Sequence, residues 1–198
     1  ERAVAMSGVT GQRWGYIAPL CSGLGAVILV LGGVDTAKVL ITAGSFGLLA
    51  IFIFILRHHA ASYTVVMTFG AVALIGGNLL WSAGQPTYQA VHWWIAFLVL
   101  TIVGERLELS RVTRLTSTAT RLFLLVAGIY GAGVVLTLFN LDAGIRLAGI
   151  GEIGLAVWLL RYDIARHTIK RNGLPQFIAA CLLAGYVWLG ISGLIGLS

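Results

Sequence analysis

The sequence predicts an all-α protein, a polytopic integral membrane bundle of about seven transmembrane helices. Of its 198 residues, 59% are hydrophobic and 10% are charged, and the mean hydropathy is +0.95. A soluble domain usually carries about 25% charged residues, so this chain cannot cover a water-facing surface. Its hydrophobic residues form long uncharged runs that are apolar on every side. A barrel would need alternating segments of about ten residues, whereas helices satisfy their own backbone groups in lipid.

Seven uncharged runs are long enough to be membrane helices. The first run ends at Gly32-Gly33, the third ends at Gly84-Gln85-Pro86, and the last begins behind Pro175, which are typical breaks and helix starts. The predicted helices cover approximately residues 14–33, 39–56, 62–82, 90–111, 120–141, 145–171 and 175–197. We expect one transmembrane domain over residues 1–198, as a fragment of a longer chain.

The cationic residues predict how the helices are oriented. If the N-terminus lies inside the cell, only Lys38 and Arg146 of the 13 Lys and Arg residues fall outside. This bias follows the positive-inside rule and predicts an N-in, C-out topology. Because the charges lie in short loops, we expect anionic lipid headgroups and not nucleic acid as their partners. The residues expected at the headgroups are Arg111, Arg114, Lys170 and Arg171.

Charged residues interrupt the fourth predicted helix before it has crossed the bilayer. Glu105 lies about 20 Å along this helix, and Arg161 lies at a similar depth in the sixth helix. An isolated charge in hydrocarbon costs about 2.5–3.5 kcal/mol near the bilayer centre. We therefore predict that Glu105, or Glu108 in its place, pairs with Arg161 or Arg166. The alternative is that Arg106 and Arg161 reach the headgroups separately.

Glu152 is a second intramembrane acid, in the glycine-rich segment GIGEIG. Intramembrane carboxylates often mark ion paths, so Glu152 is a candidate for an ion or solute path, together with Asn78. The alternative is a structural hydrogen bond from Glu152 to a neighbouring helix, for example to Asn78 or to a tyrosine.

The sixth predicted helix continues past the apolar region as RYDIARHTIKR. If this segment is helical, Asp163 lies three and four residues before Arg166 and His167. Side chains at these spacings are neighbours on a helix. We therefore predict contacts of Asp163 with Arg166 and His167.

Binding of haem or copper would need histidines at matching depths in the membrane. His58, His59 and His167 lie at the predicted cytoplasmic edge, and His92 lies at the outer edge. The first three could form a metal site at the cytoplasmic edge. Interfacial anchoring is the simpler explanation for all four residues.

Two segments carry a family resemblance: GERLELSR at residues 104–111 and RYDIARHTIKRNGLPQFIAACLLAGYVWLGISGL at residues 161–194. They resemble a group of uncharacterised bacterial polytopic membrane proteins that is distantly similar to NnrS-type haem- and copper-containing membrane proteins. The resemblance implies a multi-pass protein of the bacterial cytoplasmic (inner) membrane. It also implies haem or copper as a cofactor to be tested.

No hydrolase or zinc motif is visible, and no catalytic residue is assigned. We expect a non-catalytic integral membrane subunit or scaffold, bound to other membrane subunits or to the rest of a longer chain. One alternative is an NnrS-like protein that binds haem or copper. The other is a proton-coupled or solute transporter that uses Glu152.

Overall fold

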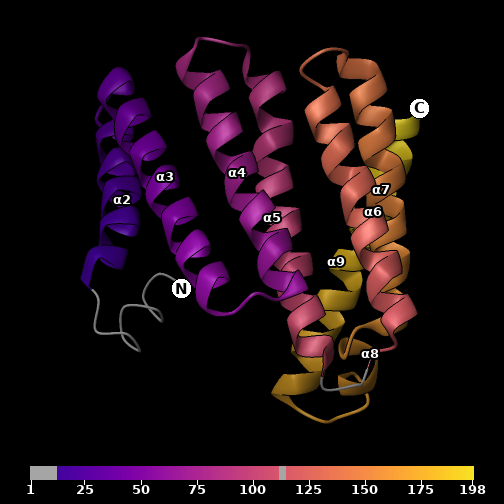
Figure 1. Ribbon diagram of the computed structural model, residues 1–198. Coiled ribbons are helices and arrows are strands. Elements are labelled where there is room, and N and C mark those ends of the chain that lie inside the picture. The colour runs from indigo at the N-terminus through magenta and orange to yellow at the C-terminus, as the bar shows by residue number, and fades with distance from the viewer. Residues whose placement is uncertain (1–12, 112–114) are drawn as a thin grey trace. The chain divides into compact units, whose positions relative to one another are not determined.

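A computed structural model describes residues 13–111 and 115–198, and every regular element in these ranges is a helix (Figure 1). The elements are η1 (Arg13–Tyr16), α2 (Ile17–Val30), α3 (Val34–His58), α4 (Ser62–Ser82), α5 (Thr87–Ser110), α6 (Ser117–Leu136), α7 (Leu141–Tyr162), α8 (Ala165–Thr168) and α9 (Leu174–Leu197). The predicted all-α fold is confirmed. Within the described ranges, α3, α4, α5, α6, α7 and α9 are long and apolar enough to cross a membrane. The helical stretch Trp14–Val30, where the first of seven spans was predicted, is shorter.

Several helices begin earlier than the uncharged runs predicted, among them α3 and α5. α3 begins at Val34, so Asp35 lies in its first turn, where the helix dipole favours an acid. α5 begins at Thr87 and has 24 residues, which gives a length of about 36 Å. α5 is therefore long enough to span a bilayer, and Glu105 and Glu108 lie in its last two turns. Its apolar run looked short because its first turn is polar.

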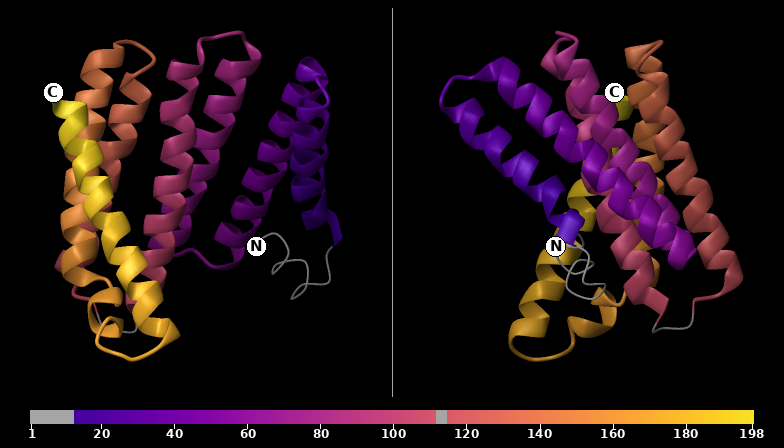
Figure 2. Two further views of the ribbon diagram at one scale, coloured as in Figure 1. Left: turned by 180° about the vertical axis from the view of Figure 1, so that it is seen from behind. Right: turned by 60° about the vertical axis from the view of Figure 1, so that its left-hand side comes forward.

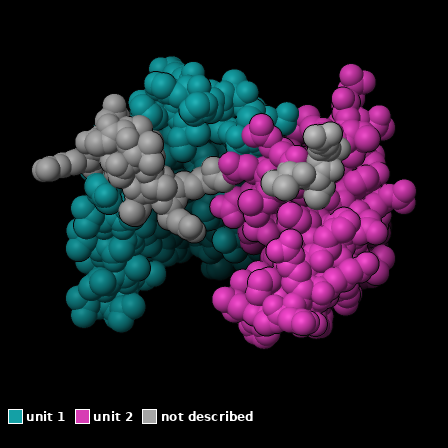
Figure 3. Space-filling model, turned by 90° about the horizontal axis from the view of Figure 1, so that it is seen from below, with its two compact units in different colours: residues 1–101 teal, residues 102–198 magenta. Residues whose placement is uncertain are grey.

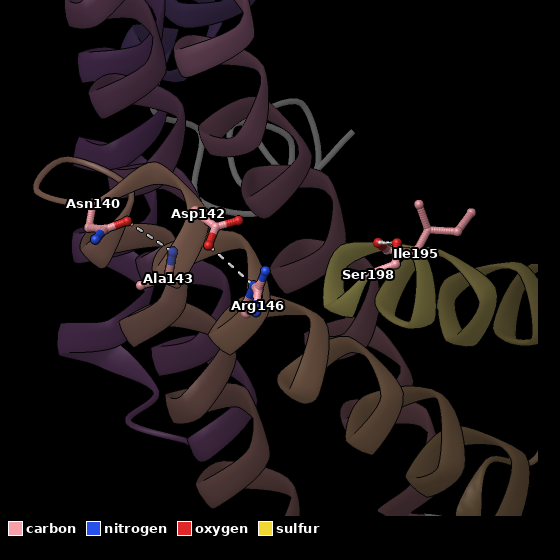
Figure 4. A network of polar contacts seen from close by, with 6 residues as sticks. All are labelled: Asn140, Asp142, Ala143, Arg146, Ile195 and Ser198. Carbon is pink, nitrogen blue, oxygen red and sulfur yellow. Dashed lines mark hydrogen bonds and ion pairs between the residues drawn. The ribbon is translucent and has the colours of Figure 1, made fainter.

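The sixth predicted helix differs from the observed one at both ends. α7 begins at Leu141, where the Asn140 side-chain oxygen accepts a hydrogen bond of 3.1 Å from the backbone N–H of Ala143 (Figure 4). An ion pair of 3.3 Å between Asp142 and Arg146 follows on the same turn. At the other end α7 stops at Tyr162, and Asp163 has extended backbone angles. The helix predicted over residues 145–171 is therefore broken at Asp163.

The chain divides into two compact units, residues 1–101 and 102–198, which are coloured separately in Figure 3. In the first unit, α2, α3, α4 and the first part of α5 follow one another as antiparallel neighbours (Figure 2). Small residues allow α4 and α5 to pack closely. A Cβ atom on Gly77 would lie 2.6 Å from the indole ring of Trp94.

The second unit contains the last turns of α5 followed by α6, α7, α8 and α9, with α7 packed against both α6 and α9. Glycines bring the backbones of these three helices together. A Cβ atom on Gly151 would lie 2.6 Å from the Cα atom of Tyr130, and one on Gly149 would lie 2.6 Å from the carbonyl oxygen of Gly193. Close packing of this kind is the usual way in which membrane helices associate.

Candidate functional site

A buried polar junction lies where α7 ends, and Asp163 is at its centre. The Asp163 side chain is fully buried, with 0% of its surface exposed. Its carboxylate accepts hydrogen bonds from the Tyr186 hydroxyl at 2.6 Å and from the Ser110 hydroxyl at 3.2 Å. It also accepts a bond of 3.3 Å from the backbone N–H of Ala165. The junction thus joins the end of α5, the break between α7 and α8, and the middle of α9.

Arg106 adds a positive charge to this junction. Its guanidinium group is a hydrogen-bonding and electrostatic neighbour of the Tyr186 hydroxyl, which itself binds Asp163. A buried carboxylate is costly unless hydrogen bonds and an opposite charge compensate it. Tyr186, Ser110 and the Ala165 backbone N–H supply the hydrogen bonds, and Arg106 lies beside the Tyr186 hydroxyl. We call the set Arg106, Ser110, Asp163 and Tyr186 the Asp163 junction.

The Asp163 junction corrects the contacts predicted for Asp163. We predicted Arg166 and His167 as partners on a continuous helix, but α7 ends before Asp163, so helical spacing does not apply there. The actual partners come from GERLELSR, which holds Arg106 and Ser110, and from GYVWLGISG, which holds Tyr186. The segments that carried the family resemblance therefore meet at this junction. A lone tyrosine in an apolar run gave no signal of this role.

The acids and arginines proposed as an intramembrane pair all lie in the second unit. Glu105 and Glu108 are partly buried in the last turns of α5. Arg161 is exposed, with its guanidinium carbon 5.7 Å from the centre of the Tyr162 ring. The Arg166 side chain donates a hydrogen bond to the Arg161 carbonyl oxygen. The structure thus gives both arginines other contacts, and the pairing of Glu105 with Arg161 stays a prediction.

Glu152 lies in the middle of α7 and is buried, with 8% of its surface exposed. Ser192 on α9 is its hydrogen-bonding neighbour. Tyr130 on α6 is an electrostatic neighbour, and its backbone lies against Gly151, next to Glu152. For the structural hydrogen bond predicted to Asn78 or to a tyrosine, a tyrosine is thus nearby, whereas Asn78 belongs to the other unit.

Asn78 lies in α4, near its end, and is buried with 2% of its surface exposed. Its side-chain oxygen accepts a hydrogen bond of 3.0 Å from the indole N–H of Trp94 on α5. Trp94 also contacts the edge of Trp81, and Lys38 lies 5.6 Å from the centre of the Trp81 ring. These contacts give Asn78 a packing role between α4 and α5.

Of the histidines proposed as metal ligands, His58 and His59 belong to the first unit and His167 belongs to the second. His58 ends α3, and its Nδ1 atom is 2.8 Å from the Phe54 carbonyl oxygen of the same helix. His59 follows it, and His167 lies in α8 of the second unit. Over residues 13–111 and 115–198, no group of three or more His, Cys, Asp or Glu side chains could hold a metal ion. No specific observation therefore favours haem or copper.

The residues expected at lipid headgroups lie around the ends of α5, α8 and α9 in the second unit. Arg111, Lys170 and Arg171 are exposed. Arg114 lies outside the described residues. Arg161 and Arg166 are also exposed at this end, whereas Arg146 lies at the start of α7. Within this unit Arg161 and Arg146 thus lie at opposite ends of α7, and the orientation stays a prediction.

These features define the class of the molecule as a polytopic, all-helical membrane protein, because six helices of the described chain are suited to cross a bilayer. The chain belongs to the family described as "Domain of unknown function (DUF8744)", whose model matches residues 1–198. No curated protein matches it, and no solved structure matches it.

Proposed function

We propose that this chain is a non-catalytic integral membrane subunit or scaffold of a larger assembly in the bacterial cytoplasmic membrane. The observation that carries the proposal is the Asp163 junction, in which buried polar groups hold helices together. Its carboxylate is fully buried and bound by Tyr186, Ser110 and a backbone N–H. A carboxylate with these contacts has its hydrogen-bonding capacity used within the protein and is not accessible to a substrate.

Other buried polar groups support the same role. The indole N–H of Trp158 donates a hydrogen bond of 2.9 Å to the Ala119 carbonyl oxygen and so joins α7 to α6. Trp94 and Asn78 join α4 to α5 in the same way. By contrast, α9 exposes large apolar side chains along its length, among them Phe177, Trp188 and Leu194. Such a surface suits lipid tails or a neighbouring membrane helix.

The proposal is tested by native mass spectrometry of the protein, extracted in mild detergent from the membranes in which it naturally occurs. We expect a particle that contains this chain and other polypeptides in a fixed ratio. Asp163→Ala should release those polypeptides. Asp142→Ala should retain them, since Asp142 is exposed and pairs only with Arg146 among the described residues. If the wild-type chain is detected alone, or only as an oligomer of itself, the proposal is contradicted.

A second candidate function is proton-coupled or solute transport through Glu152. It is favoured by one observation, a carboxyl group that is buried in the middle of a spanning helix, with Ser192 as its hydrogen-bonding neighbour. Transport by the purified protein in proteoliposomes tests this candidate. Flux that is present in the wild type and lost in Glu152→Gln supports it, and flux that is unchanged by the substitution contradicts it.

A further inference from the structure

Glu152 lies halfway along α7. Because α7 begins at Leu141, Glu152 is 11 residues (152 − 141) from its start and 10 (162 − 152) from its end at Tyr162. At about 1.5 Å per residue, these separations are about 16 Å and 15 Å. A bilayer core is about 30 Å thick, so Glu152 sits at the centre of a helix that matches this thickness.

Both helices that pack on α7 carry polar groups near Glu152. On α6 the titratable groups are Arg121 and Tyr130, and the neighbour of Glu152 is Tyr130. On α9 they are Cys181 and Tyr186, and Tyr186 binds Asp163 instead. Ser192 supplies the hydroxyl from α9.

Charged groups of α7 itself lie at its ends. Asp142 and Arg146 pair with each other at its start, and Arg161 lies in its last turn. Within the described part of the chain, no cationic side chain is thus in contact with the Glu152 carboxyl.

Glycines close the packing on either side of Glu152. Gly151 is against the backbone of Tyr130 on α6, and Gly149 is against the backbone of Gly193 on α9. In both places an added Cβ atom would come within 2.6 Å of a backbone atom of the other helix. Backbones this close leave no room for a lipid tail or a water molecule between them. The Glu152 side chain is itself buried, with 8% of its surface exposed, and Ser192 is its hydrogen-bonding neighbour.

An ionised carboxylate at this position would need a counter-charge, because a charged side chain at the bilayer centre costs about 2.5–3.5 kcal/mol even on insertion scales. Binding one proton removes the charge. The neutral acid has an O–H donor and a carbonyl acceptor, and a serine or tyrosine hydroxyl can accept the first and donate to the second.

We propose that Glu152 is a proton-binding site at the centre of the membrane. One carboxylate oxygen accepts a proton to give the neutral acid, which exchanges hydrogen bonds with Ser192 and Tyr130, and loss of the proton restores the carboxylate. The proposal deepens the second candidate function, since it names the ion as a proton. It requires only reversible proton binding, so its test does not depend on transport.

The test is labelling with dicyclohexylcarbodiimide, an apolar reagent that reacts with protonated carboxyl groups in hydrocarbon. The full-length protein is reconstituted into liposomes, and the adduct is located by peptide mass spectrometry. We expect one adduct per chain, on Glu152, with labelling that falls as the pH is raised along a single-proton curve. Glu152→Gln should remove the adduct, and Asp142→Asn should retain it.

A second pair of variants separates proton binding from a merely structural role. Ser192→Ala removes a hydroxyl that contacts the carboxyl group and should move the pH profile of labelling. Ser198→Ala is the matched control, because the Ser198 hydroxyl donates a hydrogen bond of 2.7 Å to the Ile195 carbonyl oxygen of its own helix (Figure 4). It should leave the profile unchanged.

Three results would overturn the proposal. The first is a folded wild-type protein that is not labelled on Glu152. The second is labelling of Glu152 at the same rate at every pH. The third is protection of Glu152 by sodium ions at constant pH, which would assign the site to a metal cation instead. A failed transport assay combined with pH-dependent labelling would contradict the transport function and leave the proton site in place.

Discussion

The hydroxyl group of Tyr186 donates a hydrogen bond of 2.6 Å to the carboxylate of Asp163, and both side chains are buried. The bond joins the middle of α9 to the point where α7 stops. Because a carboxylate acceptor makes a stronger hydrogen bond than a neutral one, this is a strong polar contact between α9 and the rest of the second unit. It also explains why an acid can be fully buried at this position.

Removing the donor should destabilise the protein. In Tyr186→Phe the ring remains, but a buried carboxylate loses one of its partners. Leaving a buried polar group unsatisfied costs about 1–3 kcal/mol, so we expect the free energy of unfolding to fall by about that amount. Denaturation in detergent micelles, followed by circular dichroism, measures the change.

Tyr162→Phe is the matched control for this experiment. It makes the same chemical change on α7, where the Tyr162 ring stacks on Trp158 and its hydroxyl has no partner among the described residues. We expect a change within about 0.5 kcal/mol. Equal losses of stability in the two variants would show that the Asp163 bond contributes nothing specific.

Backbone contact between α6 and α7 should make Gly151 intolerant of a side chain. In Gly151→Ala the new methyl group would lie 2.6 Å from backbone atoms of Tyr130, which cannot turn away as a side chain could. Overpacking of this kind costs about 1–3 kcal/mol.

Gly128→Ala is the control, because nothing lies within 4 Å of its added Cβ atom. There alanine should be neutral, or should stabilise the helix by up to about 1 kcal/mol. Thermal unfolding in micelles compares the two variants, and a similar melting temperature for both would contradict the close contact.

The contact between α4 and α5 gives a prediction for the first unit. Trp94→Phe leaves the side-chain oxygen of buried Asn78 without its donor, so we expect a loss of about 1–3 kcal/mol. Trp188→Phe makes the same change on α9, where Trp188 is 69% exposed, and should have little effect. Chemical unfolding monitored by circular dichroism distinguishes them. A harmless Trp94→Phe would mean that the bond to Asn78 is dispensable.

The orientation inferred from the cationic residues is tested by accessibility. Single cysteines are placed at Lys170, in the turn after α8, and at Phe139, which is 83% exposed between α6 and α7. Cys21 and Cys181 are replaced by alanine in both variants. A thiol reagent that cannot cross membranes should label Phe139→Cys in intact cells, and Lys170→Cys only in inverted vesicles. The opposite pattern would reverse the orientation.

The sequence predicted the helical fold well because hydrocarbon imposes a simple rule, namely long apolar runs that end in polar residues. It predicted the helix ends less well, since a membrane helix can begin in polar residues. The fifth helix was predicted to run to residue 141, but in the structure Asn140 caps α7 and Asp142 lies in its first turn. Polar residues at a boundary show that a helix ends there without showing which of the two helices they belong to.

The buried polar contacts were harder to predict, because they depend on distant residues. Asp163 lies among cations in the sequence, between Arg161 and Arg166, so its contacts were predicted there. Its partners Ser110 and Tyr186 are 53 and 23 residues away. Neither shows a polar pattern of its own. Glu152 was recognised from sequence because an acid in an apolar run is conspicuous, but its serine partner was not.

The break at Asp163 also sets where the basic segment after it can reach. A helix that continued from Tyr162 to Arg171 would carry Arg171 about 14 Å further out, into the aqueous phase. Instead α8 packs against α9, so the cations that follow it belong to a turn between two helices and not to an extension of α7. The residue whose carboxylate binds Tyr186 thus also marks where the basic segment leaves the axis of α7.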